Sequence, residues 1–534
     1  MRSPSLLSVL ALTAGIGAAA NAGQDTPREL SLVYIADVHA QIEPKAELFW
    51  SDDGERYVED AGGLSRVATV FDRIREERPG SALFIDGGDT FQGSGPAAWS
   101  EGRVVVEPTN ALGLDMGIPG NWSVTYRKQA LLERAEELDH PLIAANMFDA
   151  DTGELLFEPY LVEEVNGIRV GVIGFTDPDI PTRQPPYLSE GLSFKGTEVI
   201  QPLVDQLRDE RDVDVVVVAT HFGLPKAIRL AEELDGVDVL LSSDTHERTY
   251  EPIVRGDTWI VEPGAFASFV GVMDLRLVDG EIVDRDWRLI ELLPEHFPED
   301  PEVERVVNEA LAPHRERMDR VIGHTDVWLA RYEVMNTPLD NLITDAIRAE
   351  TGADIALSNG FRFAPATAPG PITVGDLWTW LPLRLQIKVG ETTGSDLQAY
   401  WEREFENVFS RDPERLFGGW LPRVSGLEVE FVSTDEVGRR LRSITLDGES
   451  LDPDKVYTVA AGNRKGAPAD RVHRLDGCTN TRRLEMTTHD AVERYLQANS
   501  PIRGVEHRRV RCIVTDGVVR SQALSSLTTE DDDR

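Results

Sequence analysis

Groups that can bind metal ions follow four apolar, β-type runs of this sequence. The segment LFIDGGDTFQGSG, residues 83–95, starts as a buried strand and delivers the carboxylate of Asp89 on a Gly-Gly turn. The other runs precede Asp37, His39, His221, Asp244 and His246, and Asn121 follows the short segment Ile-Pro-Gly. Ligands of open α/β sheets bind beyond the carboxyl ends of the strands, so we expect these side chains to lie together.

Carboxylate, imidazole and amide groups together suit one or two divalent cations, with Mn²⁺ the first choice and Zn²⁺, Mg²⁺ or Fe as alternatives. Asp89 could bridge such a pair. Two cations lower the pKa of a bound water and neutralise charge on a phosphoryl-like group during in-line attack. Each motif alone is weak, but three of the ten histidines follow β-type runs, and we expect the other seven to be solvated. The combination predicts a two-metal hydrolase.

Apolar β-branched runs alternate with amphipathic helical stretches, such as residues 64–77 and 129–138, from residue 29 to about residue 291. This alternation is typical of a layered α/β domain. A segment rich in proline and acid then leads into a helical stretch from Pro301 to about Val321, which we interpret as an exposed linker. The predicted organisation is a signal peptide (1–22), a catalytic domain (29–298), a linker helix (299–322), a second domain (323–516) and a disordered tail (517–534).

The amino terminus and the charge predict the compartment and exclude some partners. Residues 1–22 have an early arginine, an apolar run and the small-residue sequence Ala-Asn-Ala, which predicts a secretory signal peptide and a periplasmic protein. No later segment is apolar enough to span a bilayer. The net charge of -39 disfavours a nucleic-acid polymer as substrate. Cys478 and Cys512 could pair in an oxidising compartment, but their sequence separation does not decide it.

The order Asp-x-His, Gly-Asp, Gly-Asn, a lone His and Thr-His resembles the metallophosphoesterase superfamily, specifically its two-domain 5′-nucleotidase branch. This resemblance implies a layered α/β/β/α sandwich followed by an α+β substrate-binding domain. It assigns one metal to Asp37, His39, Asp89 and His246, and the other to Asp89, Asn121, His221 and Asp244. It also implies catalytic roles at Asp89, Asn121, Trp122 and Arg362.

Two positions depart from the family pattern. Trp122 replaces a histidine that acts on the leaving group or transition state, and indole has one N–H donor and no titratable group. Asp244 replaces another histidine, and a carboxylate still ligates but prefers harder cations such as Mn²⁺. We expect an altered site that still binds metal.

The second domain carries the expected substrate contacts. The resemblance implies that Arg362 grips the phosphate and that Trp420 stacks on a nucleobase, with Arg384 and Arg423 as weaker candidates. The family's second aromatic is missing from the segment AAGNRKGAPADRVH, residues 460–473. A two-ring clamp around a base is therefore in doubt.

The leading hypothesis is an exported hydrolase that cleaves nucleotides or other small phosphomonoesters. A narrower resemblance to the thiosulfohydrolase of bacterial sulfur oxidation rests on DGGDTFQGS, on Trp122 within NWSVTY, on GFRF (360–363) and on the run from residue 408 to 426. It implies a dimanganese site and a sulfur-carrier protein as partner. A third hypothesis is a non-catalytic binding protein, against which the retained ligands argue.

Overall fold

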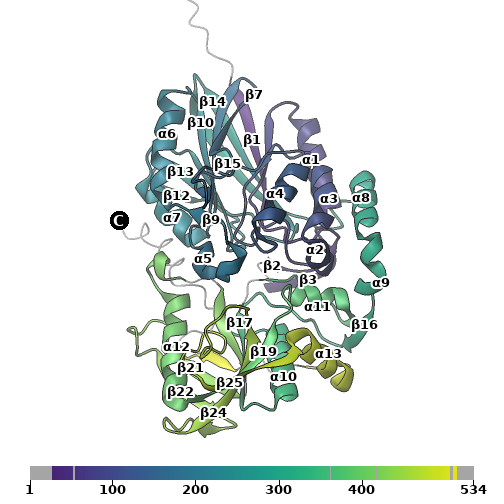
Figure 1. The fold of residues 1–534 in the computed structure, drawn as a ribbon. Helices are drawn as coiled ribbons and strands as arrows, with labels where there is room; N and C mark the ends of the chain where they lie inside the picture. Colours follow the sequence, from purple (N-terminus) through teal and green to yellow (C-terminus); the bar gives the residue numbers. More distant parts are fainter. Residues whose placement is uncertain (1–26, 52–53, 361–362, 417–418, 505–508, 514–534) are drawn as a thin grey trace, which may run out of the picture.

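The computed structural model describes residues 27–51, 54–360, 363–416, 419–504 and 509–513. The predicted signal peptide, Arg362 and the predicted tail lie outside these residues. Figure 1 shows two domains, the N-terminal one in purple to teal and the C-terminal one in green to yellow. The described residues contain no helix of the length and apolarity needed to cross a membrane.

Two mixed sheets form the N-terminal domain. The five-stranded sheet has the order β15 (Glu281–Glu291), β14 (Phe269–Val278), β1 (Arg28–Ile35), β4 (Ala82–Asp86) and β5 (Met116–Gly117). The six-stranded sheet has the order β12 (Ile253–Arg255), β13 (Thr258–Val261), β11 (Val239–Ser243), β10 (Val215–His221), β8 (Ile168–Thr176) and β7 (Tyr160–Val165).

The strands alternate between two buried faces, which produces a four-layer sandwich. On β1, Leu30 and Leu32 pack between the sheets with residues of β10 and β11, whereas Val33 and Ile35 face outward to a second core. Helix α1 (Leu64–Glu77) covers that outer face, and α6 (Ile200–Asp209) and α7 (Leu224–Glu233) cover the outer face of the other sheet. The predicted α/β/β/α architecture is confirmed.

Register brings the predicted ligands to one edge. β1 pairs in parallel with β4, so that Ile35 lies beside Asp86, and β10 pairs in parallel with β11, so that His221 lies beside Ser243. Parallel strands end on the same side, and the segments that follow β1, β4, β10 and β11 therefore meet there.

The connection between the domains is partly buried and consists of short helical segments, whereas an exposed linker helix was predicted. Helix α8 (Pro301–Leu311) starts at Asp300, whose side chain accepts from the backbone N–H groups of Glu302 and Val303. Its apolar face packs with α1 in the outer core of the N-terminal domain. The helix ends before Pro313, which has no N–H to continue it, and a 3₁₀ turn leads to the short α9 (Arg315–Met318).

The C-terminal domain combines three sheets with helices, which fits the predicted α+β class. One sheet has the order β20 (Trp420–Ser425), β17 (Ile355–Gly360), β24 (Val456–Asn463), β19 (Gln386–Thr393) and β25 (Thr479–Thr487). Helices α10 (Pro338–Thr351), α12 (Gly394–Phe409) and α13 (Thr488–Asn499) contribute to the two cores of this domain. Cys478 and Cys512 are both buried and form no disulfide with each other.

Candidate metal centre

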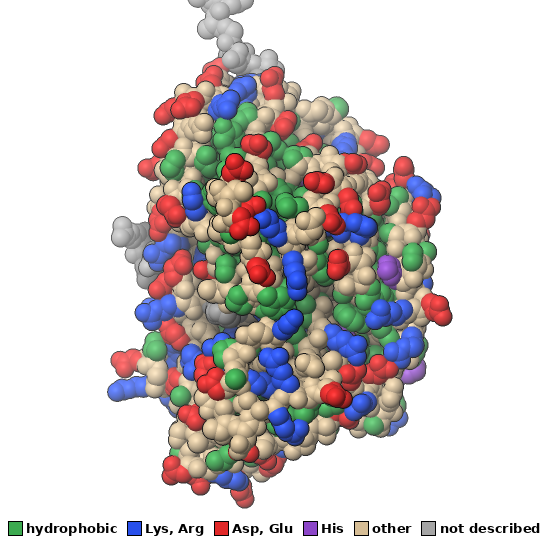
Figure 2. All heavy atoms as spheres, viewed as in Figure 1, with side chains coloured by type: hydrophobic (Ala, Val, Ile, Leu, Met, Phe, Trp, Pro, Cys, Tyr) green, Lys and Arg blue, Asp and Glu red, His purple; other side chains and the backbone are tan. Residues whose placement is uncertain are grey.

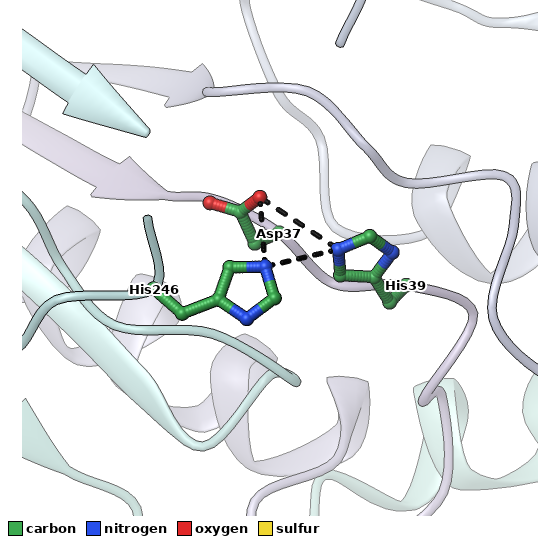
Figure 3. Close-up of side chains that lie close together, drawn as sticks. All are labelled: Asp37, His39 and His246. Atoms are coloured by element: carbon green, nitrogen blue, oxygen red, sulfur yellow. Dashed lines mark hydrogen bonds and ion pairs between the residues drawn. The ribbon is translucent and has the colours of Figure 1, made fainter. Parts of the chain in front are cut away.

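Five of the predicted ligands form two groups whose ligand atoms lie within 4.8 Å of one another. The first group is Asp37, His39 and His246, drawn in Figure 3, where the carboxylate and both imidazoles converge. The second is Asp37, Asp89 and His221. All five side chains are buried. Because Asp37 belongs to both groups, the arrangement suits two neighbouring cations.

Two carboxylates lie between the groups. Asp37 Oδ1 is 3.3 Å from His246 Nε2 and 3.8 Å from His221 Nε2. Asp89 Oδ2 is 3.2 Å from His221 Nε2 and 3.8 Å from His39 Nε2. Bridging by Asp89 stays a prediction, and the distances give Asp37 the same opportunity.

Backbone strain marks the turns that carry these ligands. The φ angle is 51° at Asp37, 50° at His39, 56° at Asp89, 85° at Asp244 and 57° at His246. Non-glycine residues in this region cost roughly 1–3 kcal/mol each, and such strain gathers at functional sites. The turns are also closely packed, because a Cβ on Gly120 would lie 2.1 Å from Asp89 Oδ1.

Backbone carbonyls orient the imidazoles toward the centre. His39 Nδ1 lies 3.0 Å from the carbonyl oxygen of Gln92, and His221 Nδ1 lies 2.6 Å from that of Gly87. When Nδ1–H donates to a carbonyl, the Nε2 lone pair is left for a metal ion.

Three of the predicted ligands have an unsatisfied polar atom within the part of the chain that the structure describes. Asp37 Oδ1, Asn121 Oδ1 and His221 Nε2 are buried with no partner in hydrogen-bonding geometry among the described residues. Such atoms are uncommon in folded proteins, and oxygen and imidazole nitrogen are the donors that divalent first-row metals accept. His39 Nε2 and His246 Nε2 lie 3.1 Å apart, where two lone pairs repel unless a proton or a cation lies between them. The residues therefore fit a divalent metal centre.

The electrostatic environment differs between the imidazoles. Burial lowers the pKa of His39 to about 4, although Asp89 opposes this effect. Burial also favours neutral His221, but the charges of Asp89 and Asp37 raise its pKa well above the usual value. Without metal, these two carboxylates therefore favour the protonated form of His221.

Asn121 and Asp244 lie beside the two groups and contact each other. Asn121 Nδ2 donates to Asp244 Oδ1 at 2.5 Å. The guanidinium of Arg183 donates hydrogen bonds to both carboxylate oxygens of Asp244, at 3.0 and 3.1 Å. It also donates to Asp177 at 2.6 Å. Arg183 therefore balances the charge that Asp244 brings. Ligation by Asp244 and Asn121 remains a prediction.

Two cavities lie between the domains; His39, Asp89 and His246 line one of them, and Asp244 lines both. One, of about 780 Å³, is lined by Trp420, Tyr332 and Trp50, and we call it the aromatic cavity. The other, of about 580 Å³, contains His39, Asp89 and Trp122, and we call it the basic cavity for reasons given below. Arg183, Asp244 and Gly419 line both.

Trp420 is 7% exposed and meets Tyr332 edge to face, with ring centroids 5.0 Å apart. Tyr332 in turn donates its hydroxyl to the carbonyl oxygen of His246 at 2.6 Å. The predicted stacking residue thus lies in the aromatic cavity, linked to the metal centre through one tyrosine. Whether it stacks on a base stays a prediction.

Two arginines predicted as weaker substrate contacts lie elsewhere. Arg423 is 1% exposed and uses its guanidinium on Asp340 and on the carbonyl oxygens of Glu333 and Val334. Arg384 lies at the surface, paired with Asp490 at 2.9 Å, and lines neither cavity. Arg423 is therefore a core residue and Arg384 a surface residue in this structure.

Sequence reasoning missed two residues that support the centre. Arg183 has no motif around it, and Glu262 lies in a buried position directly after β13. Glu262 accepts from Ser242, from Thr245 and from the N–H of Glu247, and so fixes the loop that presents His246. No local pattern could reveal either. The expectation that all seven remaining histidines are solvated is also wrong, because His140 and His489 are buried.

Comparison with known proteins gives two family matches, one in each domain. The model of calcineurin-like phosphoesterases matches residues 30–248, and that of the 5′-nucleotidase C-terminal domain matches residues 321–463. Among curated relatives, protein 5NUC of Lutzomyia longipalpis is 26% identical over 91% of this chain and 93% of its own. The trifunctional nucleotide phosphoesterase YfkN of Bacillus subtilis is 24% identical, and the aligned region spans only 32% of that protein.

Two solved structures share the fold over nearly their whole length. Sulfate thiohydrolase SoxB of Thermus thermophilus superposes with a TM-score of 0.82 and 24% identity, covering 92% of this chain and 98% of its own. A 5′-nucleotidase precursor from Thermus thermophilus gives a TM-score of 0.78, also at 24% identity, covering 91% and 100%. With both family matches and the convergent ligands, the chain belongs to the metallophosphoesterases that carry a 5′-nucleotidase C-terminal domain, a group of metal-dependent phosphoester hydrolases.

Proposed function

We propose that this protein is an exported phosphomonoesterase that releases phosphate from nucleotides with the help of two divalent cations, Mn²⁺ being the first choice. The observation that carries the proposal is the pair of ligand groups sharing Asp37 at the edge of both sheets. The predicted signal peptide is the basis for export to the periplasm.

The side chains divide the work. Asp37, His39 and His246 would hold one cation. Asp37, Asp89 and His221 would hold the other. Asn121 and Asp244 would complete the ligands of this second cation. Bound metal ions supply an activated water and compensate charge on the phosphoryl oxygens. Arg183 keeps Asp244 oriented through two hydrogen bonds. Arg362 is proposed to grip the phosphate, and Trp420 to contact the base from the aromatic cavity.

Trp122 limits the chemistry of the leaving group. Its backbone N–H donates to Asp89 Oδ1 at 2.8 Å, which fixes the turn, but its indole cannot donate a proton to a departing alkoxide. Aryl esters such as 4-nitrophenyl phosphate, whose leaving groups need no protonation, are therefore expected to turn over faster than nucleotides, whose alkoxide would take its proton from water.

The test is metal analysis of the purified protein together with phosphate release from AMP, GMP, UMP, ribose 5-phosphate and 4-nitrophenyl phosphate under Mn²⁺. We expect about two metal ions per chain and turnover of every ester, with weak discrimination among bases because residues 460–473 lack the family's second aromatic. A chain that binds no metal, or that releases no phosphate from any ester, contradicts the proposal.

A second candidate is sulfate release from a thiosulfonate on a sulfur-carrier protein. It is favoured by Trp122, since a sulfonate transfer to water from a thiolate leaving group needs no general acid. The same assay tests it with a thiosulfonate-bearing peptide. Sulfate release without phosphate release would select this candidate over the nucleotidase.

A further inference from the structure

The charged side chains that line the basic cavity are mainly cationic, although the protein as a whole is acidic. The whole chain has 93 acidic and 54 basic residues. Yet the acidic residues that line this cavity are Asp89 and Asp244, both proposed metal ligands, whereas its basic lining residues are Arg183, Arg464, Lys465, Arg471 and Arg474. In the view of Figure 2, Lys and Arg side chains gather on the face where the domains meet.

Three of these cations already have carboxylate partners. Arg183 binds Asp177 and Asp244, Arg471 binds Asp476, and Arg474 lies 3.0 Å from Glu404. Their charges are balanced within the protein. They line the cavity but offer little net attraction to a ligand.

Arg464 and Lys465, which follow β24, are different. The guanidinium of Arg464 donates to the carbonyl oxygen of Arg183 at 2.9 Å and to Gln184 Oε1 at 3.3 Å, and it lies 5.5 Å from the ring centroid of Trp122. Lys465 Nζ lies 5.6 Å from the ring centroid of Tyr187. Within the part of the chain that the structure describes, no carboxylate pairs with either cation.

These contacts hold the cations in place without neutralising them. The neutral partners of Arg464 come from the N-terminal domain and fix a half-buried charge that belongs to the C-terminal domain. A half-buried guanidinium without a counter-ion is costly, and an anion supplied by a ligand would remove that cost. Trp122 connects this charge to the metal centre, because Asn121 is its neighbour in the chain.

We propose that Arg464 and Lys465 form a second anion subsite, so that the preferred substrates are phosphomonoesters carrying a further anionic group, such as a carboxylate or another phosphate, at the end remote from the metals. The inference rests on the proposed hydrolysis at the metal centre. On this proposal the basic cavity selects substrates by their charge, whereas the aromatic cavity provides ring surfaces for contact.

The test compares matched substrates on the Mn²⁺-loaded full chain: phenyl phosphate with 4-carboxyphenyl phosphate, and glycerol 3-phosphate with 3-phosphoglycerate. We expect the member of each pair that also carries a carboxylate to have a kcat/KM about tenfold higher at low salt. This preference should shrink as ionic strength rises. The double variant Arg464→Gln, Lys465→Gln should abolish the preference, while the esters without a carboxylate keep their rates. Arg464→Lys should retain part of it.

Arg439→Gln and Lys455→Gln serve as matched controls, because both side chains are exposed and line neither cavity. They should leave the preference intact. Equal kcat/KM values within each pair, or an equal loss for both members in the double variant, would overturn the proposal. If no ester is turned over, the proposed function fails, and calorimetric titration of the same pairs then decides separately: a Kd ratio of one would refute the subsite.

Discussion

Asp89 illustrates how much one side chain contributes at this centre. Its Oδ1 accepts from the backbone of Trp122, and its Oδ2 faces two imidazoles. Asp89→Ala should therefore abolish hydrolysis and reduce bound metal by about half or more, because Asp89 is the predicted bridging carboxylate and its loss would take a ligand from both cations. Metal analysis and phosphate release measure this directly. A variant that kept its metals and its full rate would refute the two-metal assignment.

Asp244 and Arg183 form a unit whose charges cancel. Asp244→His would leave Arg183 paired only with Asp177 and would place a neutral imidazole beside Asn121. We expect metal binding to persist and the preference to shift toward Zn²⁺, which suits imidazole better than Mn²⁺ does. Competition between the two metals, read by elemental analysis, measures the shift. An unchanged profile in both Asp244→His and Asp244→Ala would remove Asp244 from the centre.

The raised pKa of His221 makes metal binding depend on pH. In the metal-free state Asp89 and Asp37 keep a proton on this ring, although burial opposes it. A cation must displace that proton, so the apparent affinity should rise with pH, by about tenfold per unit while one proton is released. The rise should stop above the metal-free pKa of His221. Titrations with Mn²⁺ in buffers of different ionisation enthalpy would show the proton release, and a pH-independent affinity would contradict it.

At the scale of elements, the loop after β11 depends on a buried carboxylate. Glu262 is fully buried and receives three different donors. Glu262→Gln keeps the shape but turns an amide N–H₂ toward one of those donors, at a cost of about 1–3 kcal/mol. We expect a lower melting temperature and weaker metal binding with an unchanged fold by circular dichroism. Glu232→Gln, on the exposed end of α7, is the matched control and should change neither.

The elements themselves were largely predictable from sequence. Helix α1 spans the predicted residues 64–77, and β1, β4, β10 and β11 end where their apolar runs end. These features depend on local periodicity, which the sequence displays. The candidate ligands Asp37, His39, Asp89, His221 and His246 were predicted for the same reason, because each follows such a run.

Features that depend on long-range contacts were not predictable. Arg183 meets Asp244 across 61 residues of sequence, and nothing near either residue signals the pair. Arg423 was assigned to substrate from its type and its motif, but it neutralises the buried Asp340. Partner and burial decide the role of an arginine, and both arise only when the chain folds.

At the scale of the molecule, both domains line the two cavities beside the metal centre. The N-terminal domain provides every residue of both metal groups, and the C-terminal domain provides Trp420 to one cavity and Arg464 to the other. Tyr332 ties the two together through the carbonyl oxygen of His246. Changes in how the domains sit would therefore alter substrate selection more than metal binding.

Helix α8 determines where this protein could be divided. Its residues Val303, Val307 and Leu311 belong to the core of the catalytic domain even though they lie in the stretch predicted as linker. A chain stopped at residue 298 would leave uncovered the side of α1 on which α8 packs and should aggregate, whereas one stopped after Met318 should stay in solution and bind metal. Size-exclusion chromatography of the two truncated chains separates these outcomes. The unit that folds is thus longer than the unit that performs the chemistry.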